Sequence, residues 1–273
     1  MYKKKYLLIS LIVLFLFTID CNNYDGSFSV KLPHREPFSP EPYSEMVFEP
    51  INESSGMVKI RQWNNTFWTL NDSGDRARIF PIRRDGSIIS PPWAGEWYEG
   101  ITINDAVNID WEDIAVDNRG NLIIGAFGDN SNTRRDLAIY LVREPYPERT
   151  VATRIYRKVM FRYPDRKKIP PERMNFDAEA VFSAGSRIYI LTKHRSDSLT
   201  KLYRFDSLEP LEINTLTLLD SFNIRGMVTG ADATPDGRKL AVLTYYSIWL
   251  FEVTDGSDNY FGGKIYWLPI RAK

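Results

Sequence analysis

The chain has 273 residues, with 35 basic and 35 acidic side chains and a pI near 6.8. This balance argues against a nucleic-acid partner, because proteins that bind nucleic acids usually carry an excess of positive charge. The two histidines, His34 and His194, are too few for a zinc site built from histidine. The aromatic content of 14% favours a β-rich fold, and a single cysteine excludes an intrachain disulfide.

The N-terminus resembles the signal of a bacterial lipoprotein. Three lysines at 3–5 precede an apolar run at 7–19, which is too short to span a bilayer because that takes about 20 residues. Cys21 follows at the place where a lipoprotein carries its acyl chains. We therefore predict a signal peptide over 1–20 and lipidation of Cys21, with the protein anchored to a membrane of the bacterial cell envelope and facing the periplasm or the cell exterior. The alternative is a plain secretory signal with an incidental cysteine.

Residues 21–50 are predicted to be a lipid-anchored tether, followed by one folded domain over 51–273. Prolines at this density favour an extended, semi-rigid spacer, and they stand at Pro33, Pro37, Pro40, Pro42 and Pro50. The alternative is a segment that lies against the fold, in which residues 43–48 form a strand.

One unit recurs along the rest of the chain: acidic residues, a short apolar strand, a turn and a second strand. Its clearest copy is 108–130, where residues 114–116 and 122–124 flank a turn that contains Gly120. The predicted strands are 57–61, 66–70, 77–82 and 87–90 in the first unit; 114–116, 122–124, 137–142 and 154–163 in the second; 175–182, 188–192 and 202–205 in the third; and 229–233, 240–244, 248–253 and 264–270 in the fourth.

Such repetition predicts an all-β fold, a β-propeller with four-stranded antiparallel blades. A β-sandwich is the alternative, but it does not predict that the same unit recurs. About four blades are recognisable, which is the low end for a propeller. Either the ring stays incomplete or the tether supplies closing strands, because an open sheet edge promotes aggregation.

Four motifs resemble a family of uncharacterised bacterial propeller proteins. These are Asp110-Trp-Glu-Asp-Ile-Ala, Gly128-Asp-Asn, Asp177-Ala-Glu-Ala-Val and Gly230-Ala-Asp-Ala-Thr-Pro-Asp-Gly. The family is similar in blade pattern to the six-bladed TolB-like, gluconolactonase/regucalcin-like and phytase esterase-like groups. The resemblance covers roughly residues 52–270. It implies the fold more than an activity, since propellers carry many unrelated functions. Family members usually continue with further blades.

In a propeller the innermost strand of each blade faces the axis. Glu112, Glu179 and Asp232 open strands that we predict to be equivalent, so their carboxylates are expected to converge. Asp72 and Asp129 leave the next strand at the same end. Converging carboxylates repel one another unless a cation such as Ca²⁺ binds them. The alternative is a network of ion pairs with nearby cations, namely Arg134, Arg135, Lys193 and Arg195.

Two functions remain open from the sequence. The first is an envelope-anchored binding or scaffold module that takes a protein or small-molecule ligand at the channel mouth. The second is a hydrolase of a lactone or phosphoester that depends on a divalent metal, with Glu112, Glu179 and Asp232 as ligands. Its catalytic base would be Glu179 or Asp129, and Lys193 and Arg195 would bind the anionic substrate. No Gly-x-Ser-x-Gly motif occurs, and His194 alone makes no catalytic triad.

Two further sets of residues have alternative interpretations. Five tryptophans either line a surface that binds carbohydrate or peptide or fill the core between blades. They are Trp63, Trp68, Trp93, Trp97 and Trp111. The basic residues Arg166, Lys167, Lys168 and Arg173 are predicted to lie in a solvated loop.

Overall fold

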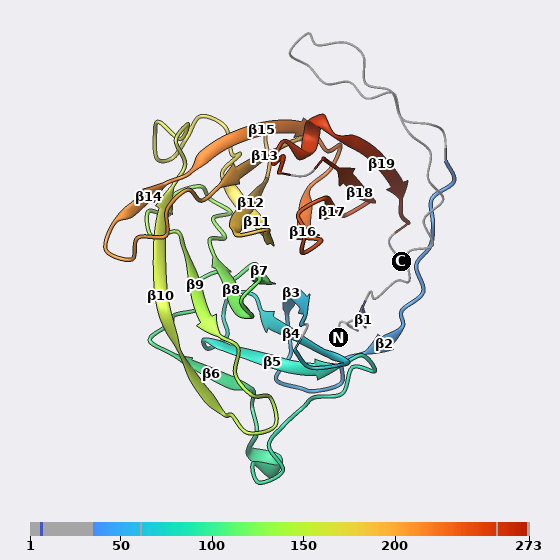
Figure 1. The fold of residues 1–273 in the computed structure, drawn as a ribbon, viewed down its shortest axis with the longest axis vertical. Helices are drawn as coiled ribbons and strands as arrows, with labels where there is room; N and C mark the ends of the chain where they lie inside the picture. The colour runs from blue at the N-terminus through green and yellow to red at the C-terminus, as the bar shows by residue number, and fades with distance from the viewer. Residues whose placement is uncertain (1–5, 8–34, 61, 255, 272–273) are drawn as a thin grey trace.

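The described strands assemble into a ring of four blades around a common axis (Figure 1). The structure is a computed structural model that describes residues 6–7, 35–60, 62–254 and 256–271. Cys21 and most of the predicted signal peptide lie outside these residues. No helix in the described ranges is long and apolar enough to cross a membrane.

Blade 1 has its four strands side by side in chain order: β3 (Ser54–Lys59), β4 (Thr66–Asn71), β5 (Arg78–Arg83) and β6 (Ile101–Asn104). The predicted fourth strand at 87–90 is wrong, since Ile88 makes only an isolated bridge to Ile82. Pro91 and Pro92 follow at once and cannot donate hydrogen bonds to a sheet. The outer position is taken instead by β6, after a loop that contains the 3₁₀ turn η1 (Gly95–Trp97).

Blade 2 confirms all four predicted strands, as β7 (Asp113–Val116), β8 (Asn121–Ala126), β9 (Ala138–Arg143) and β10 (Ala152–Arg162). The start of β10 pairs in parallel with β6, and its end pairs in parallel with β14 (Ile213–Thr215). Blades 1 and 2 therefore share one continuous sheet at the perimeter of the ring.

Blades 3 and 4 are separate four-stranded sheets. Blade 3 contains β11 (Asp177–Ala184), β12 (Arg187–Lys193), β13 (Leu199–Arg204) and β15 (Thr217–Asn223). The first three strands were predicted, and β15 was not. Blade 4 contains the four predicted strands β16 (Val228–Ala233), β17 (Lys239–Thr244), β18 (Ser247–Glu252) and β19 (Lys264–Pro269). The short turn η2 (Tyr260–Gly262) precedes β19. The predicted β-propeller is thus confirmed.

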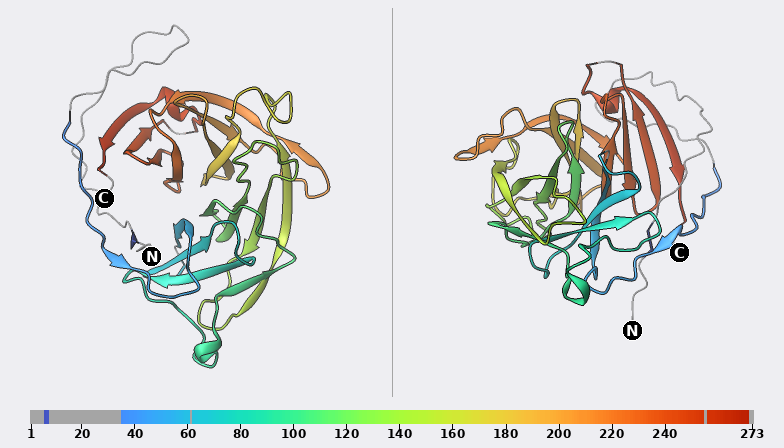
Figure 2. Two further views of the ribbon diagram at one scale, coloured as in Figure 1. Left: turned by 180° about the vertical axis from the view of Figure 1, so that it is seen from behind. Right: turned by 60° about the horizontal axis from the view of Figure 1, so that its bottom comes forward.

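Part of the predicted tether lies against the ring. Phe38 bridges Ile270 just after β19, with Phe38 N donating to Pro269 O at 2.9 Å. The chain then passes through β2 (Ser44–Glu45), which pairs with β1 (Tyr6–Leu7), and reaches blade 1. There the buried Met46 and Ile51 belong to one apolar cluster with three residues of β4 and β5: Phe67, Phe80 and Ile82. This segment therefore connects the outer edge of blade 4 to blade 1 (Figures 1 and 2).

The core consists of apolar clusters between successive blades, where the innermost strands β3, β7, β11 and β16 follow one another around the axis. Trp68 and Trp111 are fully buried in the cluster between blades 1 and 2, which confirms that they pack between blades. Trp249 has the same role between blades 3 and 4. Burying a large apolar side chain contributes about 1.5–3 kcal/mol each, so these clusters hold the blades together.

Candidate metal site

Each innermost strand begins with an extra residue that bulges out of register with the second strand of its blade. The register shift occurs at the same position in blades 1, 3 and 4. Glu112 holds this position in blade 2, where its N–H donates to the carbonyl of Gly125 while Asp113 pairs with the same glycine. The four equivalent residues are therefore Ser55, Glu112, Glu179 and Thr229. A bulge turns its side chain away from the regular strand pattern, and here it directs Glu112 and Glu179 toward each other.

Five carboxylates gather at this end of the ring. Glu112 is shared by two groups whose oxygens lie within 4.8 Å of one another, one with Asp72 and Asp110 and the other with Asp177 and Glu179. Asp72 follows the end of β4 in blade 1, whereas Asp177 and Glu179 belong to β11 in blade 3. The cluster thus joins three blades, and its convergence agrees with the expectation for Glu112 and Glu179.

The second group is neutralised by cations of the chain. Lys193 Nζ lies 2.8 Å from Glu179 Oε1, and Arg195 lies 3.0 Å from Asp177 Oδ2. Arg195 also donates to Asn130 Oδ1. The ion-pair alternative therefore describes Lys193 and Arg195 correctly, because both are held by acids.

The first group, which comprises Asp72, Asp110 and Glu112, is different. The Glu112 side chain is buried, with 5% of the residue exposed, and no described residue donates a hydrogen bond to its carboxylate. Ser55, its equivalent in blade 1, donates only to the backbone carbonyl of Glu112, at 2.5 Å. No ion pair of the described residues includes an acid of this group, although the charge of Arg134 acts on Asp110. An ionised carboxylate buried without a donor is costly.

Burial raises the pKa of the acids in this cluster, and their mutual repulsion adds to the effect. For Glu112 the neighbouring charges are those of Glu179, Asp72 and Asp110. Burial and the charge of Asp72 raise the pKa of Asp110 to about 6. Burial also raises the pKa of Glu179, against the opposing effect of its bond to Lys193. Such shifts mark carboxylates that bind a proton or a cation at neutral pH.

Gly128 makes the close approach of these acids possible. A Cβ at this residue would collide with Glu112 Oε1 and with the Asp110 carboxylate. Gly128 N also donates to Asp110 O at 3.2 Å, which fixes the loop beside the cluster. This glycine belongs to the Gly128-Asp-Asn motif, but the motif alone does not show that the acids approach each other here.

The Asp129 carboxylate is engaged by backbone N–H groups and by an arginine. Its buried carboxylate accepts hydrogen bonds from the backbone N–H groups of Thr133 and Arg134 and lies 3.1 Å from Arg166. The prediction that Arg166 lies in a solvated loop is wrong, since only 4% of its side chain is exposed. Two other arginines were expected to pair with the acids of the cluster. Arg134 donates a hydrogen bond to the backbone carbonyl of Gly128 at 2.6 Å, and no described ion pair joins Arg135 to the cluster.

Asp232 is not equivalent to Glu112 and Glu179, because Thr229 occupies that position in β16. Asp232 is exposed and borders a hollow of about 460 Å³ with Lys59, Val116 and Ala233. These three residues end β3, β7 and β16, so the hollow lies at the opposite end of the innermost strands. The equivalence was wrong because a short acidic motif does not reveal where a bulge shifts the register.

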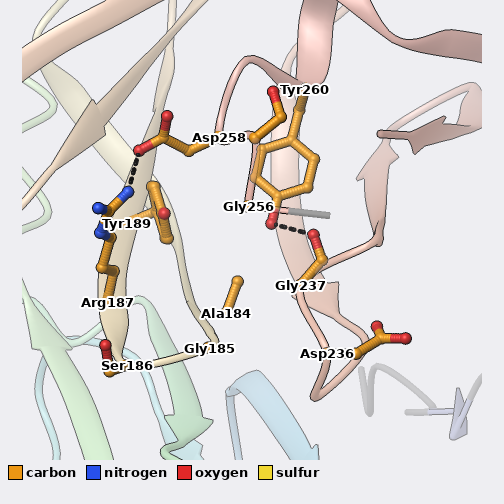
Figure 3. A pocket seen from close by; sticks show the side chains of 11 residues that line it. Ala184, Gly185, Ser186, Arg187, Tyr189, Asp236, Gly237, Gly256, Asp258 and Tyr260 are labelled. Carbon is orange, nitrogen blue, oxygen red and sulfur yellow. Dashed lines mark hydrogen bonds and ion pairs between the residues drawn. The ribbon is translucent and has the colours of Figure 1, made fainter. Parts of the chain in front are cut away.

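A second cavity, of about 230 Å³, lies between blades 3 and 4 and is formed by the turn after β11 and the loop before β19 (Figure 3). Its polar groups already bind one another. Arg187 lies 2.8 Å from Asp258, and Tyr260 donates its hydroxyl hydrogen to Gly237 O at 2.8 Å. This cavity therefore has less unsatisfied chemistry than the carboxylate cluster.

Comparisons with known proteins add little beyond the fold. No family model and no curated protein matches the chain. One similar solved structure is a provisionally named 6-phosphogluconolactonase from Bacteroides uniformis. It is 11% identical in sequence, the match covers 81% of this chain and 56% of that chain, and the TM-score is 0.38. Chaetomium thermophilum Sqt1, bound to the N-terminus of ribosomal protein L10, has 14% identity, coverages of 80% and 51%, and a TM-score of 0.40.

The Malassezia sympodialis allergen Mala s 1 has 11% identity, coverages of 79% and 63%, and a TM-score of 0.40. This chain thus spans between half and two thirds of the structures that it resembles. The sheets define the class of protein, which is an all-β propeller with four described blades. At this level of likeness the comparisons assign no function.

Proposed function

We propose that the chain is a ligand-binding β-propeller of the bacterial cell envelope, anchored through a lipid on Cys21, that holds a divalent cation among Asp72, Asp110 and Glu112. The observation that supports the cation is the buried Glu112 carboxylate, which has no described donor and two further acids beside it. Hard cations neutralise such a group, and Ca²⁺ takes six to eight oxygen ligands.

Binding is favoured over catalysis by the way the other charged groups are used. Lys193 and Arg195 are held in ion pairs, and Asp129 is consumed by backbone N–H groups and Arg166. Three carboxylates leave coordination positions of Ca²⁺ unfilled by side chains. A protein or small molecule with oxygen donors would complete the coordination at the channel mouth.

The second candidate is a hydrolase of a lactone or phosphoester, favoured by one observation. Burial raises the pKa of Glu179 toward neutrality, which suits a carboxylate that accepts and returns a proton. A bound divalent cation would polarise the ester oxygen. Lys193 would hold Glu179 in place through its 2.8 Å contact.

The test is a Ca²⁺ titration of the purified chain, followed by thermal unfolding. We expect the unfolding temperature to rise with Ca²⁺ and to return on chelation, since a ligand of the folded state adds about 2.7 kcal/mol at 100 times its dissociation constant. Asp236→Asn is the control, because this acid lies in an exposed turn and accepts only from neighbours in that turn.

A transition that ignores Ca²⁺, Mg²⁺ and Mn²⁺ alike would refute the cation site. Hydrolysis of a lactone or phosphoester that a chelator abolishes would favour the second candidate. Ca²⁺ stabilisation without any hydrolysis would favour the binding module.

A further inference from the structure

The loop between β5 and β6 exposes two large aromatic side chains. Trp93 is 67% exposed and Trp97 is 91% exposed, although both belong to a residue type that is usually buried in large part. The loop with η1 projects from the perimeter of the ring, away from the sheets (Figures 1 and 2). These two tryptophans therefore contribute nothing to the core, unlike Trp68 and Trp111.

The base of this loop is fixed. Tyr98 is buried, and its ring centroid lies 6.1 Å from that of Phe48. Successive turns are closed by Ala94 N donating to Pro91 O at 3.0 Å and by Trp97 N donating to Ala94 O at 3.2 Å. The buried Pro91 further restricts the backbone. The loop thus presents its tryptophans on a preorganised support, which lowers the entropic cost of binding.

The surface beside the two tryptophans is mostly apolar. They border an open hollow of about 640 Å³ together with Ala94, Gly95, Glu96 and Val151. Glu96 is the one charged side chain along it. Sites for sugars and other polar molecules hold several convergent polar groups, and this hollow offers too few of them. The exposed charged residues next in the chain to the two tryptophans or to Val151, or paired with one of these residues, balance: the acids are Glu96, Glu99 and Glu148, and the bases are Arg149, Arg154 and Arg76, which pairs with Glu99.

We propose that this loop, which we call the Trp93–Trp97 loop, inserts its two indole rings into the interfacial region of the membrane that carries the lipid anchor. The proposal rests on the anchoring part of the proposed function. Indole rings favour the boundary between headgroups and acyl chains, because one edge is polar and the body is apolar. The balanced charges predict a contact that depends on apolar insertion and not on anionic lipids.

The tether allows this contact. Cys21 precedes the first residue of the described ring segment, Arg35, by 14 positions. At about 3.3–3.6 Å per extended residue, that length reaches roughly 50 Å at most. The domain therefore stays close to the bilayer, and a second contact at the Trp93–Trp97 loop would fix the orientation of the ring on the membrane.

The experiment reconstitutes the purified full chain into vesicles of zwitterionic phosphatidylcholine, with or without bromine on the acyl chains near the headgroups. Bromine quenches the fluorescence of indole rings that enter the bilayer. We expect quenching for the unmodified chain and its loss in the double variant Trp93→Ala/Trp97→Ala. The control Tyr246→Ala removes an aromatic side chain that is 66% exposed on another blade, and it should leave the quenching unchanged.

Equal quenching in the double variant and the unmodified chain, or none in either, would overturn the proposal. So would a soluble sugar or peptide that changes the fluorescence of these two tryptophans in the absence of lipid, since it would assign the loop to that ligand. A Cys21→Ser change added to the double variant Trp93→Ala/Trp97→Ala separates the two proposals. If this triple variant stays in the membrane fraction as the double variant does, the lipid anchor fails, while the quenching of the chain that keeps both tryptophans still reports on the loop.

Discussion

Glu112 combines three properties that seldom occur together. Only 5% of the residue is exposed, and its carboxylate accepts no hydrogen bond from a described residue. Carboxylate oxygens of other acids lie within 4.8 Å of its own. By contrast, Glu179, at the same position of the next blade, has Lys193 at 2.8 Å. The same bulge thus produces a satisfied acid in blade 3 and an unsatisfied one in blade 2. This difference, and not the number of acids, is the reason that we propose a cation beside Glu112.

We predict that Glu112→Gln stabilises the chain in the absence of Ca²⁺ and removes its response to Ca²⁺. The amide keeps the shape and needs neither a buried charge nor the uptake of a proton on folding, so a gain of about 1–3 kcal/mol is expected. Denaturant unfolding with and without Ca²⁺ measures both effects.

The matched control is Glu179→Gln, which leaves the Lys193 ammonium buried without its carboxylate. It should lose about 3–5 kcal/mol, since breaking one partner of a buried ion pair is strongly destabilising. If both variants change stability in the same direction, the distinction between the two acids is wrong.

Packing between innermost strands differs around the ring, and one glycine position shows it. The residue after the bulge is Gly56 in β3, Asp113 in β7 and Gly230 in β16. A Cβ on Gly56 would lie 2.6 Å from Asp113 Cα, so blades 1 and 2 approach each other through this glycine. A Cβ on Gly230 would meet no atom within 4 Å. Blade 4 therefore lacks the close strand neighbour that blade 1 has at this position.

Gly56→Ala is predicted to destabilise the chain by about 1–3 kcal/mol, because overpacking forces the two backbones apart. Gly230→Ala, its counterpart in blade 4, should be neutral or slightly stabilising, since alanine loses less entropy on folding and meets no obstacle. Thermal unfolding of the two variants compares them directly. Equal losses would show that blade 4 is packed against a neighbour at this position.

Asp113 connects the innermost strands of blades 2 and 3 through a side-chain hydrogen bond. Its buried side chain accepts a hydrogen bond from Val181 N in β11 at 2.9 Å and one from Ile114 N at 2.8 Å. Burial raises the pKa of this carboxyl well above its ordinary value. The blade 2 acid that follows the bulge therefore ties β7 to β11, while Glu112 before it belongs to the cluster.

Across the whole molecule, the cluster lowers stability as the pH rises. His194, whose pKa is lowered by burial, acts in the opposite direction, and only below its ordinary pKa of 6.5. Burial raises the pKa of Asp110, Glu112, Asp113 and Glu179 above the ordinary values of 3.8 and 4.5. Between the ordinary and the raised pKa values, the folded chain binds more protons than the unfolded chain. The free energy of unfolding therefore falls as the pH rises through this window.

We predict that the metal-free chain unfolds at a lower temperature at about pH 8 than at about pH 5.5, and that Ca²⁺ removes most of this difference by neutralising the ionised acids. Acids whose pKa is lowered, such as Asp75 and Asp206, lose their stabilising effect only below about pH 4 and do not act in this window. Calorimetry across the pH range is the measurement. A metal-free unfolding temperature that is flat or rises over this window contradicts the prediction.

The sequence by itself determined the blade pattern, because period-2 apolar runs and turns such as the one at Gly120 are local signals. It also indicated that Glu112 and Glu179 lie near each other, since both open an inner strand. The tertiary structure decided the rest. The misplacement of Asp232 came from a bulge, which a strand motif does not show. The outer strands β6 and β15 were missed because edge pairing depends on distant partners.

The tertiary structure also decides which acids pair with which cations. Arg166 reaches Asp129 across 37 positions of the chain, and Asp72 joins Glu112 from another blade. Whether an acid is satisfied depends on which cations the folded backbone brings within about 4 Å of it. Local residue patterns therefore specify strands and turns, but only the packed ring specifies that Glu179 has a lysine and Glu112 has none among the described residues.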